Sequence, residues 1–417
     1  MSAAVRRSLA SFAVPNFRRY FAGLFTSIAG NWMQIVAELW LILTLTGSGV
    51  LVGVATALQF TGILLLGAWG GALADRFDKR RLLMLTQAVM AVPALAMLVL
   101  WSAGLVTAPI VLALIAIRGA AMAVDVPLRQ SFVIEVVGRG RLVNAVNLNG
   151  VLIQGGRIVG PAIAGVIIAL WGVGPVFAIN VATFGVMIAA LSAMDPSQLV
   201  ERPAAPGRGG VREAIRYVAR TPELRLPLLM TAVLGTLGFN FHVILPLLAR
   251  FSFDGEVTSY SALLVSMAVG AIAGALVNGA RGRTGPEIVA AAALAFGLAA
   301  LLAAAAPTLP LEMLALLLLG AAAVTFSAAV ISGLQLASDP TMRGRVMALF
   351  SIVFFGSTPI GGPLAGWLGE VASPRAALLL GALAGLGVAA FSIRSRRGRG
   401  AQGRGEAPTG ELPVPAS

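Results

Sequence analysis

Four ionisable side chains lie inside long apolar runs of this sequence, where a charge needs either a partner or a function. They are Glu38, Arg118, Arg157 and His242. If those runs cross a bilayer, a charge at its centre costs about 2.5–3.5 kcal/mol on insertion scales. Each residue should therefore face an internal cavity or pair with another group. We interpret the four as candidates for proton coupling or for lining a cavity, and the alternative for each is a static buried contact.

A polar stripe accompanies Glu38. Ser27, Asn31, Gln34 and Glu38 follow steps of four, three and four residues, which places them on one face of a helix. A stripe of this kind would be costly against lipid, so we expect it to line an internal cavity. The polar residues that we expect around a substrate are Asn31, Gln34, Gln59, Gln154 and Asn240.

The residue inventory excludes several kinds of chemistry. The chain has no Cys and a single His, and Lys79 is its only Lys. Thiolate and His-cluster metal sites are thereby excluded, as are Schiff-base chemistry and the lysine of a P-loop. We therefore predict no metal, no cofactor and no enzymatic activity. A membrane-embedded enzyme and a non-transporting sensor remain as further alternatives.

The elements that must position these side chains are membrane-spanning helices. Of the 417 residues, 58% are hydrophobic and only 11% are charged, whereas soluble domains carry about 25% charged residues. Apolar runs of about 20 residues, long enough to cross a bilayer as a helix, recur along the chain. We predict an all-α integral membrane protein with twelve spans, at residues 18–45, 50–74, 82–103, 107–131, 144–170, 174–193, 225–249, 258–280, 287–306, 310–335, 346–369 and 375–393.

The basic residues indicate an orientation. The net charge of +13 is spread along the chain, and outside Arg118, Arg157, Arg250 and Arg375 every basic residue falls in a tail, in alternate loops or at the span ends that adjoin them. Because Arg and Lys mark cytoplasmic loops, we expect a multi-pass protein of a bacterial inner membrane with both termini cytoplasmic. The basic excess is then a topology signal in contact with lipid headgroups, and no nucleic-acid partner is expected.

A polar stretch rich in Pro and Gly divides the chain, and short motifs recur on either side of it. Gly160-Pro161 and Gly362-Pro363 match at an offset of about 200 residues, as do Arg139-Gly140-Arg141 and Arg343-Gly344-Arg345. We interpret the chain as a duplicated six-helix unit with the substrate site between its halves. The predicted parts are a first six-helix half at 1–194, a cytoplasmic linker at 195–224, a second half at 225–393 and a disordered cytoplasmic tail at 394–417.

Several of these motifs resemble those of the major facilitator superfamily. The stretch Gly71-Ala72-Leu73-Ala74-Asp75-Arg76-Phe77-Asp78-Lys79-Arg80-Arg81 is similar to its motif between spans 2 and 3, with Asp78 where a Gly is usual. The stretch from Gly156 to Gly165 resembles the span-5 motif of antiporters and efflux proteins, and Arg118-Gly119 resembles the span-4 motif. The stretch from Val126 to Asn147 is similar to a bacterial efflux branch that contains enterobactin exporters. The resemblance covers essentially the whole chain.

The resemblance implies the major facilitator fold and a role for each motif. Glycine and charged residues after span 2 would form a gate and conformational switch, and Asp125, near the end of its span, could meet a loop Arg there. The expected gate residues are Gly71, Asp75, Arg76, Arg80 and Asp125. Small residues of span 5 would pack closely on span 8, and this hinge packing is expected at Gly156, Gly160, Pro161 and Gly165.

The leading hypothesis for function is secondary active export of a small amphiphilic or hydrophobic molecule, siderophore- or drug-like, by proton antiport with alternating access. The alternative is an importer or facilitator of a lysolipid or a nutrient, which the Gly-Pro motif of span 5 argues against. The expected partners are the small-molecule substrate, the proton as coupling ion and membrane lipids, and the chain is expected to act as a monomer.

Overall fold

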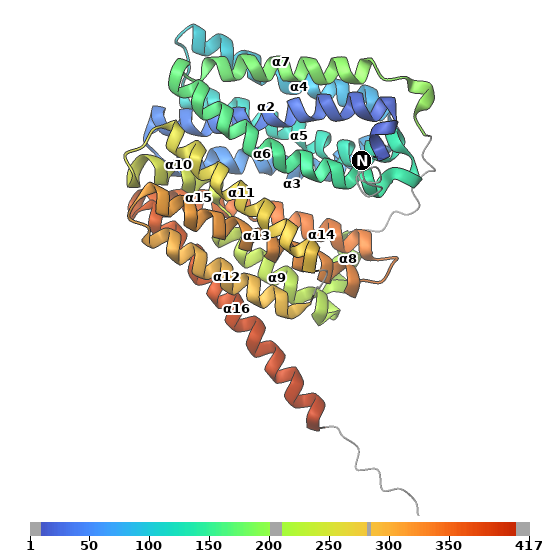
Figure 1. Cartoon of the computed structure of the whole chain (residues 1–417), viewed down its shortest axis with the longest axis vertical. Coiled ribbons are helices and arrows are strands. Elements are labelled where there is room, and N and C mark those ends of the chain that lie inside the picture. The colour runs from blue at the N-terminus through green and yellow to red at the C-terminus, as the bar shows by residue number, and fades with distance from the viewer. Residues whose placement is uncertain (1–9, 201–210, 282–284, 406–417) are drawn as a thin grey trace, which may run out of the picture.

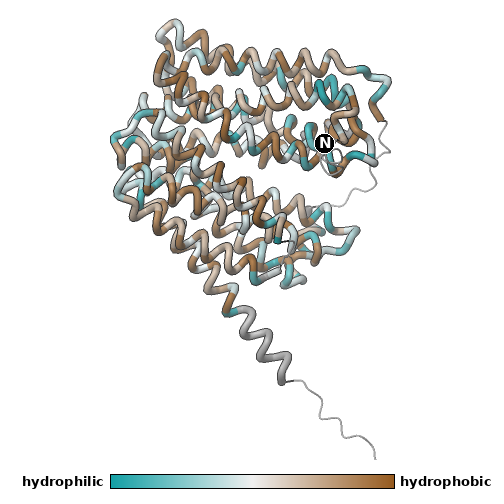
Figure 2. The backbone as a smooth tube through the Cα atoms, viewed as in Figure 1, coloured by the Kyte–Doolittle hydropathy of each residue, from teal (hydrophilic) through white to brown (hydrophobic). Residues whose placement is uncertain are grey.

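The computed structural model describes residues 10–200, 211–281 and 285–405, and within them not the side chains of 68–72, 74–76, 211–212, 286 and 395–405. Within the described residues, twelve segments are long and apolar enough to cross a bilayer, and all secondary structure is helical. The helices are hydrophobic along most of their length, with hydrophilic residues toward their ends (Figure 2). The predicted all-α membrane fold with twelve spans is therefore confirmed.

The first six spans form one bundle (Figure 1). The helix α2 packs against α6 and α7, α4 packs against α5 and α7, and α3 packs against α5. The tight turn between the first two spans follows from local chemistry, because Gly47 adopts the left-handed conformation with φ of 64° that ends α2. The bounds are α2 (Pro15–Thr46), α3 (Gly49–Arg76), α4 (Lys79–Ser102), α5 (Ala108–Val137), α6 (Leu142–Trp171) and α7 (Gly174–Ser192), with the short turns η1 (Ala10–Ala13) and η2 (Arg139–Arg141) before α2 and α6.

The second six spans form the other bundle, and two of them are interrupted. The seventh span breaks between Gly238 and Asn240, and the eleventh breaks at Ser357, where Pro359 in the first turn of the next helix lacks a backbone donor. Interrupted helices are tolerated at membrane depth where they line a cavity. The bounds are α9 (Pro222–Leu237), α10 (Phe241–Leu247), the π-helical turn η4 (Leu248–Ser252), α11 (Val257–Arg281), α12 (Pro286–Ala305), α13 (Leu309–Ala337), α14 (Arg343–Gly356), α15 (Thr358–Val371) and α16 (Pro374–Gly405).

Two equivalent pairs of helices join the halves. The helix α3 packs against α15, and α6 packs against α11. These pairs are span 2 with span 11 and span 5 with span 8. A shift of six spans exchanges one pair for the other, as expected of a duplicated six-helix unit.

Glycine backbones make a close contact between the halves. A Cβ atom added to Gly49 or Gly53 of α3 would overlap main-chain atoms of Gly366 or Gly362 of α15. Small residues of this kind let two helix backbones approach without intervening side chains. We call Gly49, Gly53, Gly362 and Gly366 the glycine seal.

Hydrogen bonds reinforce one end of the glycine seal. The Oγ atom of Ser48 donates to Oε2 of Glu370 at 2.7 Å, and the backbone N–H of Val50 donates to the same oxygen at 3.1 Å. The carboxylate of Glu370 thereby satisfies donors at the N-terminus of α3, where negative charge is favourable. Toward the opposite end, where the N-terminus lies, the two bundles diverge (Figure 1).

Helical segments also lie outside the spans. Besides the turn η3 (Pro196–Gln198), the predicted linker contains α8 (Val211–Arg220), which is bound to the second half by an ion pair from Glu213 to Arg345 at 2.8 Å. The tail expected to be disordered from residue 394 instead continues α16 to Gly405, and 406–417 lie outside the described residues. The expectation weighed glycine and charge, whereas arginine is a good helix former that is favourable near a helix C-terminus.

We expect Gly53→Ala to open the glycine seal. The added methyl group would overlap the Gly362 backbone, an overpacking of about 1–3 kcal/mol, so the halves should separate here and approach one another at the opposite end. Since the chain has no Cys, spin labels on cysteines introduced at the exposed positions Val146 of α6 and Leu336 of α13 can report that approach as a shorter distance.

The matched control is Gly67→Ala in the same helix. Its added carbon would have only a side-chain atom of Ile63 within 4 Å, at 3.9 Å. The label distances should therefore be those of the parent protein. A distance distribution that Gly53→Ala leaves unchanged would show that the glycine contact does not control how the halves are oriented.

Candidate functional site

A cavity of about 280 Å³ lies between the two halves. The first half contributes residues of α2, α3 and α6. The second half contributes both helix breaks, at 239–242 and 354–358, together with residues of α11 and α13. Since ligand pockets in proteins measure about 300–1,000 Å³, this cavity is of a size to hold a small molecule.

Aromatic side chains from both halves contribute to the cavity wall. The ring of His242 lies between those of Trp32 and Phe60, at centroid distances of 5.4 and 6.4 Å. Phe60 stacks in turn on Phe355 at 6.2 Å. Trp32 and Phe60 belong to the first half and the other two rings to the second, so a molecule between them would contact both halves at once.

Arg157 lies in the cavity wall without an acidic partner. Its guanidinium carbon is 5.1 Å from the centre of the Trp32 ring. Its Nη1 atom is 3.5 Å from Oε1 of Gln154, at the limit of a hydrogen bond. No carboxylate within the described residues forms an ion pair with it. We expected Arg157 either to line a cavity or to form an ion pair, and in the structure it lines the cavity.

Glu38 and Arg118 form a buried ion pair inside the first bundle and do not line this cavity. Nη2 of Arg118 lies 2.5 Å from Oε2 of Glu38 and Nε lies 3.2 Å from Oε1, a two-bond contact between side chains that are 0% and 1% exposed. Gln34 donates to Glu38 at 2.6 Å. The polar stripe of α2 therefore faces α5 and α7, which corrects the expectation that it lines the cavity. Periodicity identifies a helix face but not the neighbour that covers it.

The remaining residues expected around a substrate divide in the same way. Asn240 lines the cavity, with its amide bonded to the carbonyl oxygen of Thr236 at 2.7 Å. Gln34 accepts from Asn180 of α7 within the first bundle. The others also lie outside the cavity lining: Asn31, which donates to the Ser27 carbonyl at 2.9 Å, Gln59, which is buried, and Gln154, which is half-buried.

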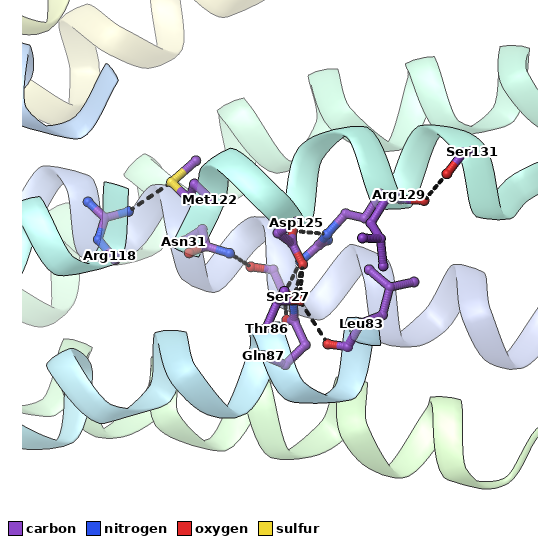
Figure 3. A network of polar contacts seen from close by, with 11 residues as sticks. Ser27, Asn31, Leu83, Thr86, Gln87, Arg118, Met122, Asp125, Arg129 and Ser131 are labelled. Atoms are coloured by element: carbon purple, nitrogen blue, oxygen red, sulfur yellow. Dashed lines mark hydrogen bonds and ion pairs between the residues drawn. The ribbon is translucent and has the colours of Figure 1, made fainter. Parts of the chain in front are cut away.

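Asp125 belongs to a second buried polar network in the first bundle (Figure 3). It accepts from Thr86 at 2.8 Å and from Gln87 at 2.7 Å, and it pairs with Arg129. Arg129 also donates to Ser27 of α2 at 3.2 Å. The partner of Asp125 is thus an Arg of its own helix and not the loop Arg that we expected, because residues four apart on a helix are neighbours.

The gate motif spans the end of α3 and the start of α4. The Nε atom of Arg80 donates to the Leu191 carbonyl at 2.6 Å, and its Nη2 donates to the Ser192 carbonyl at 2.8 Å. These are carbonyl groups at the end of α7 that have no partner within the helix, so Arg80 fastens a helix end inside the first half. Three other expected gate residues have side chains outside the described part of the structure, and their gate role stays a prediction: Gly71, Asp75 and Arg76.

The small residues of α6 pack against two helices. An added Cβ atom at Gly160 would lie 2.6 Å from Cβ of Trp32 in α2, and Gly156 faces the same helix, whereas Gly165 faces Ser261 of α11. The expectation that these residues face span 8 therefore applies to Gly165 alone. Gly156 and Gly165 are nine residues apart, about two and a half helical turns, which puts them on opposite faces. Pro161 lines the cavity.

Several polar residues with defined places in the structure were not expected from the sequence. Thr86, Gln87, Arg129 and Asn180 complete the two buried networks, and their only signal is polarity inside an apolar run. Glu312, in the first turn of α13, is fully buried, and neither of its carboxylate oxygens has a hydrogen-bond partner within the described residues. Because Glu312 lies near the start of a span, its position in the sequence is typical of a charged residue at a helix end.

The chain is similar to known transporters along most of its length. A sequence model of the family described as transmembrane secretion effectors matches residues 6–407. The multidrug efflux pump Tap of Mycolicibacterium fortuitum is 28% identical over 378 residues, 86% of this chain and 90% of the pump. The staphyloferrin A transporter of Staphylococcus aureus is 28% identical over 261 residues, 62% of this chain and 65% of that transporter, slightly less than two thirds of its length.

Solved transporter structures share the fold. The nucleoside transporter NupG has a TM-score of 0.71 at 12% identity, covering 92% of this chain and 99% of NupG. The inward-open xylose transporter XylE from E. coli has a TM-score of 0.70 at 14% identity, covering 92% and 96%. At such identities the likeness extends to the fold and not to the substrate.

We expect Gly160→Leu to disturb the cavity through Trp32. The larger side chain would meet Cβ of Trp32 and the backbone of α2, an overpacking of about 1–3 kcal/mol, and should displace the indole ring from the cavity wall. Thermal unfolding of the purified protein measures the loss of stability. Gly150→Leu in the same helix is the control, because an added Cβ atom there has no neighbour within 4 Å. Equal unfolding temperatures in the two variants would contradict close packing at Gly160.

Proposed function

Because this chain belongs to the transmembrane secretion effectors, a family of the major facilitator superfamily, it is a transporter and not an enzyme, and we propose that it exports a small amphiphilic or hydrophobic molecule. The observation that carries the proposal is the aromatic cavity enclosed by both halves at the two helix breaks. In transporters built from two repeats, the substrate binds between the repeats and interrupted helices contribute to its site. Relatives named as a multidrug efflux pump and as a transporter of staphyloferrin A support a small-molecule substrate.

Alternating access is the mechanism that we propose. The glycine seal brings the halves into contact at the end where α3 begins, and the bundles diverge at the end that carries the N-terminus. Basic loops lie at that same end, which supports a cytoplasmic location of both termini in a bacterial inner membrane. The conformation described here then opens toward the cytoplasm, where an exporter takes up its substrate. Rocking of the halves about the cavity would break the seal and release the substrate outside, within a single chain.

Entry of protons is the driving force that we propose. The Glu38 carboxylate neutralises the Arg118 guanidinium deep in the first bundle. Protonation of Glu38 would leave Arg118 without its counter-charge. A buried charge without a partner is destabilising, so protonation would favour a shift of α2 relative to α5. A proton that enters gains about 2.3 kcal/mol per 100 mV of membrane potential, which is enough for modest uphill export without nucleotide hydrolysis.

We expect Glu38→Gln to separate substrate movement from the proton gradient. The amide keeps the size of the carboxyl group and can still accept hydrogen bonds, but it cannot take up and release a proton. Flux of small molecules in proteoliposomes with an imposed pH gradient measures the effect, with anionic, neutral and cationic aromatic compounds as candidates. Downhill exchange should persist in the variant, and uphill accumulation in proportion to the gradient should be lost.

Asp125→Asn is the comparison variant. Asp125 is held by Thr86, Gln87 and Arg129, so its loss should lower stability while the remaining flux still follows the pH gradient. If the Glu38→Gln protein still pumps uphill with the gradient, Glu38 has a structural role only. If the parent protein moves compounds solely into the compartment that corresponds to the cytoplasm, the chain is an importer.

A further inference from the structure

Resting on the proposed function, we propose that the substrate is an organic anion with a flat aromatic body, whose acidic group pairs with Arg157. Among the described residues that line the cavity, Arg157 is the one with a permanent charge, and that charge is positive. No Asp or Glu of the described part of the chain lines it. The charge of the site therefore favours a ligand of negative sign.

The contacts of Arg157 differ from those of Arg118 and Arg129, two other arginines of the first half. Arg118 and Arg129 each meet a carboxylate, from Glu38 and Asp125. Arg157 meets an aromatic ring and the distant amide oxygen of Gln154. A guanidinium has five N–H donors, and a contact with a ring uses none of them. Most of these donors thus have no acceptor within the described residues, although a charge at this depth is costly without a partner.

A carboxylate or a sulfonate supplies what Arg157 lacks. The guanidinium fork matches two oxygens of such a group in parallel hydrogen bonds, and the ion pair strengthens when it is shielded from water. A permanently cationic aromatic compound has no acid to pair with in this cavity and would be repelled by Arg157. We therefore expect the cavity to bind anionic aromatic compounds in preference to cationic ones, even when the two are equally hydrophobic.

The rest of the cavity fits the body of such a molecule. Trp32, Phe60 and Phe355 line the cavity with aromatic rings from both halves, and such a lining favours an aromatic group of one or two rings in the available volume. Two polar atoms beside them, Oδ1 of Asn240 and Nδ1 of His242, are buried without a hydrogen-bond partner within the described residues. A hydroxyl or amide donor on the ligand would satisfy the Asn240 oxygen.

The test compares three probes of nearly equal shape. Purified full-length protein in lipid nanodiscs is titrated with 2-naphthoate, neutral 2-naphthamide and cationic N-methylquinolinium, with binding followed by calorimetry. We expect naphthoate to bind about 10- to 100-fold more tightly than the other two, as a charge-assisted pair would provide. Arg157→Gln should remove this preference while binding of the amide stays within about twofold of the parent value. Arg157→Lys should retain part of the preference, because it keeps the charge but not the fork.

A control variant and a flux measurement make the outcomes distinct. Arg250→Gln removes an exposed Arg that does not line the cavity, and it should leave the preference for naphthoate intact. Equal binding of the three probes, binding of none, or equal losses for all three in Arg157→Gln would overturn the anion assignment. Transport of the quinolinium but not of naphthoate would overturn it too, yet leave export standing. Tight binding of naphthoate with no translocation of any probe would support the anion site and overturn export.

Discussion

A charge inside an apolar helix must be neutralised, and the interior of this transporter is organised around that constraint. For two arginines of the first half the requirement is met inside the bundle, where Arg118 pairs with Glu38 and Arg129 pairs with Asp125. Gln34 of α2 bonds Glu38 and accepts in turn from Asn180 of α7, and groups of α2 and α4 complete the other pair. Buried pairs require such partners if they are not to destabilise the fold. The polar networks thereby connect α2, α4, α5 and α7 to one another and do not extend to the interface with the second half.

The second half contributes a different kind of feature to the site. Its seventh and eleventh spans are interrupted beside the cavity, so side chains of the break residues, among them Asn240 and Phe355, project where an unbroken helix would present a continuous wall. The first half supplies the cation and two of the rings. The two halves share short sequence motifs and the same number of spans, yet ionic networks characterise one half and broken helices the other. A ligand between them contacts both kinds of feature.

The twelve spans could be predicted because the length and composition of an apolar run are enough to identify a membrane helix. Gly238 and Pro359 lie at the helix breaks, and both residue types are typical of helix ends. These residue types do not, however, reveal whether a helix bends or stops. The placement of Glu38 could not be predicted, because its partner Arg118 lies 80 residues away on another helix. Local periodicity correctly placed the polar residues on one face of α2, but the prediction that this face borders the cavity was wrong. For Gly156 and Gly165, counting the helical rotation between them would have separated their partners.

If the halves rock as proposed, Arg157, the cation among the described residues that line the cavity, would make the empty transporter sensitive to voltage. Arg157 would become accessible first from one side of the membrane and then from the other, so its charge would experience part of the transmembrane field. A potential that is negative inside would favour the inward-open state of the empty protein, by at most about 2.3 kcal/mol per 100 mV. A bound monoanion would cancel the charge, and the loaded protein would then reorient with little electrical work. The membrane potential would thus govern the return of the unloaded transporter, and turnover would follow voltage even when substrate is saturating.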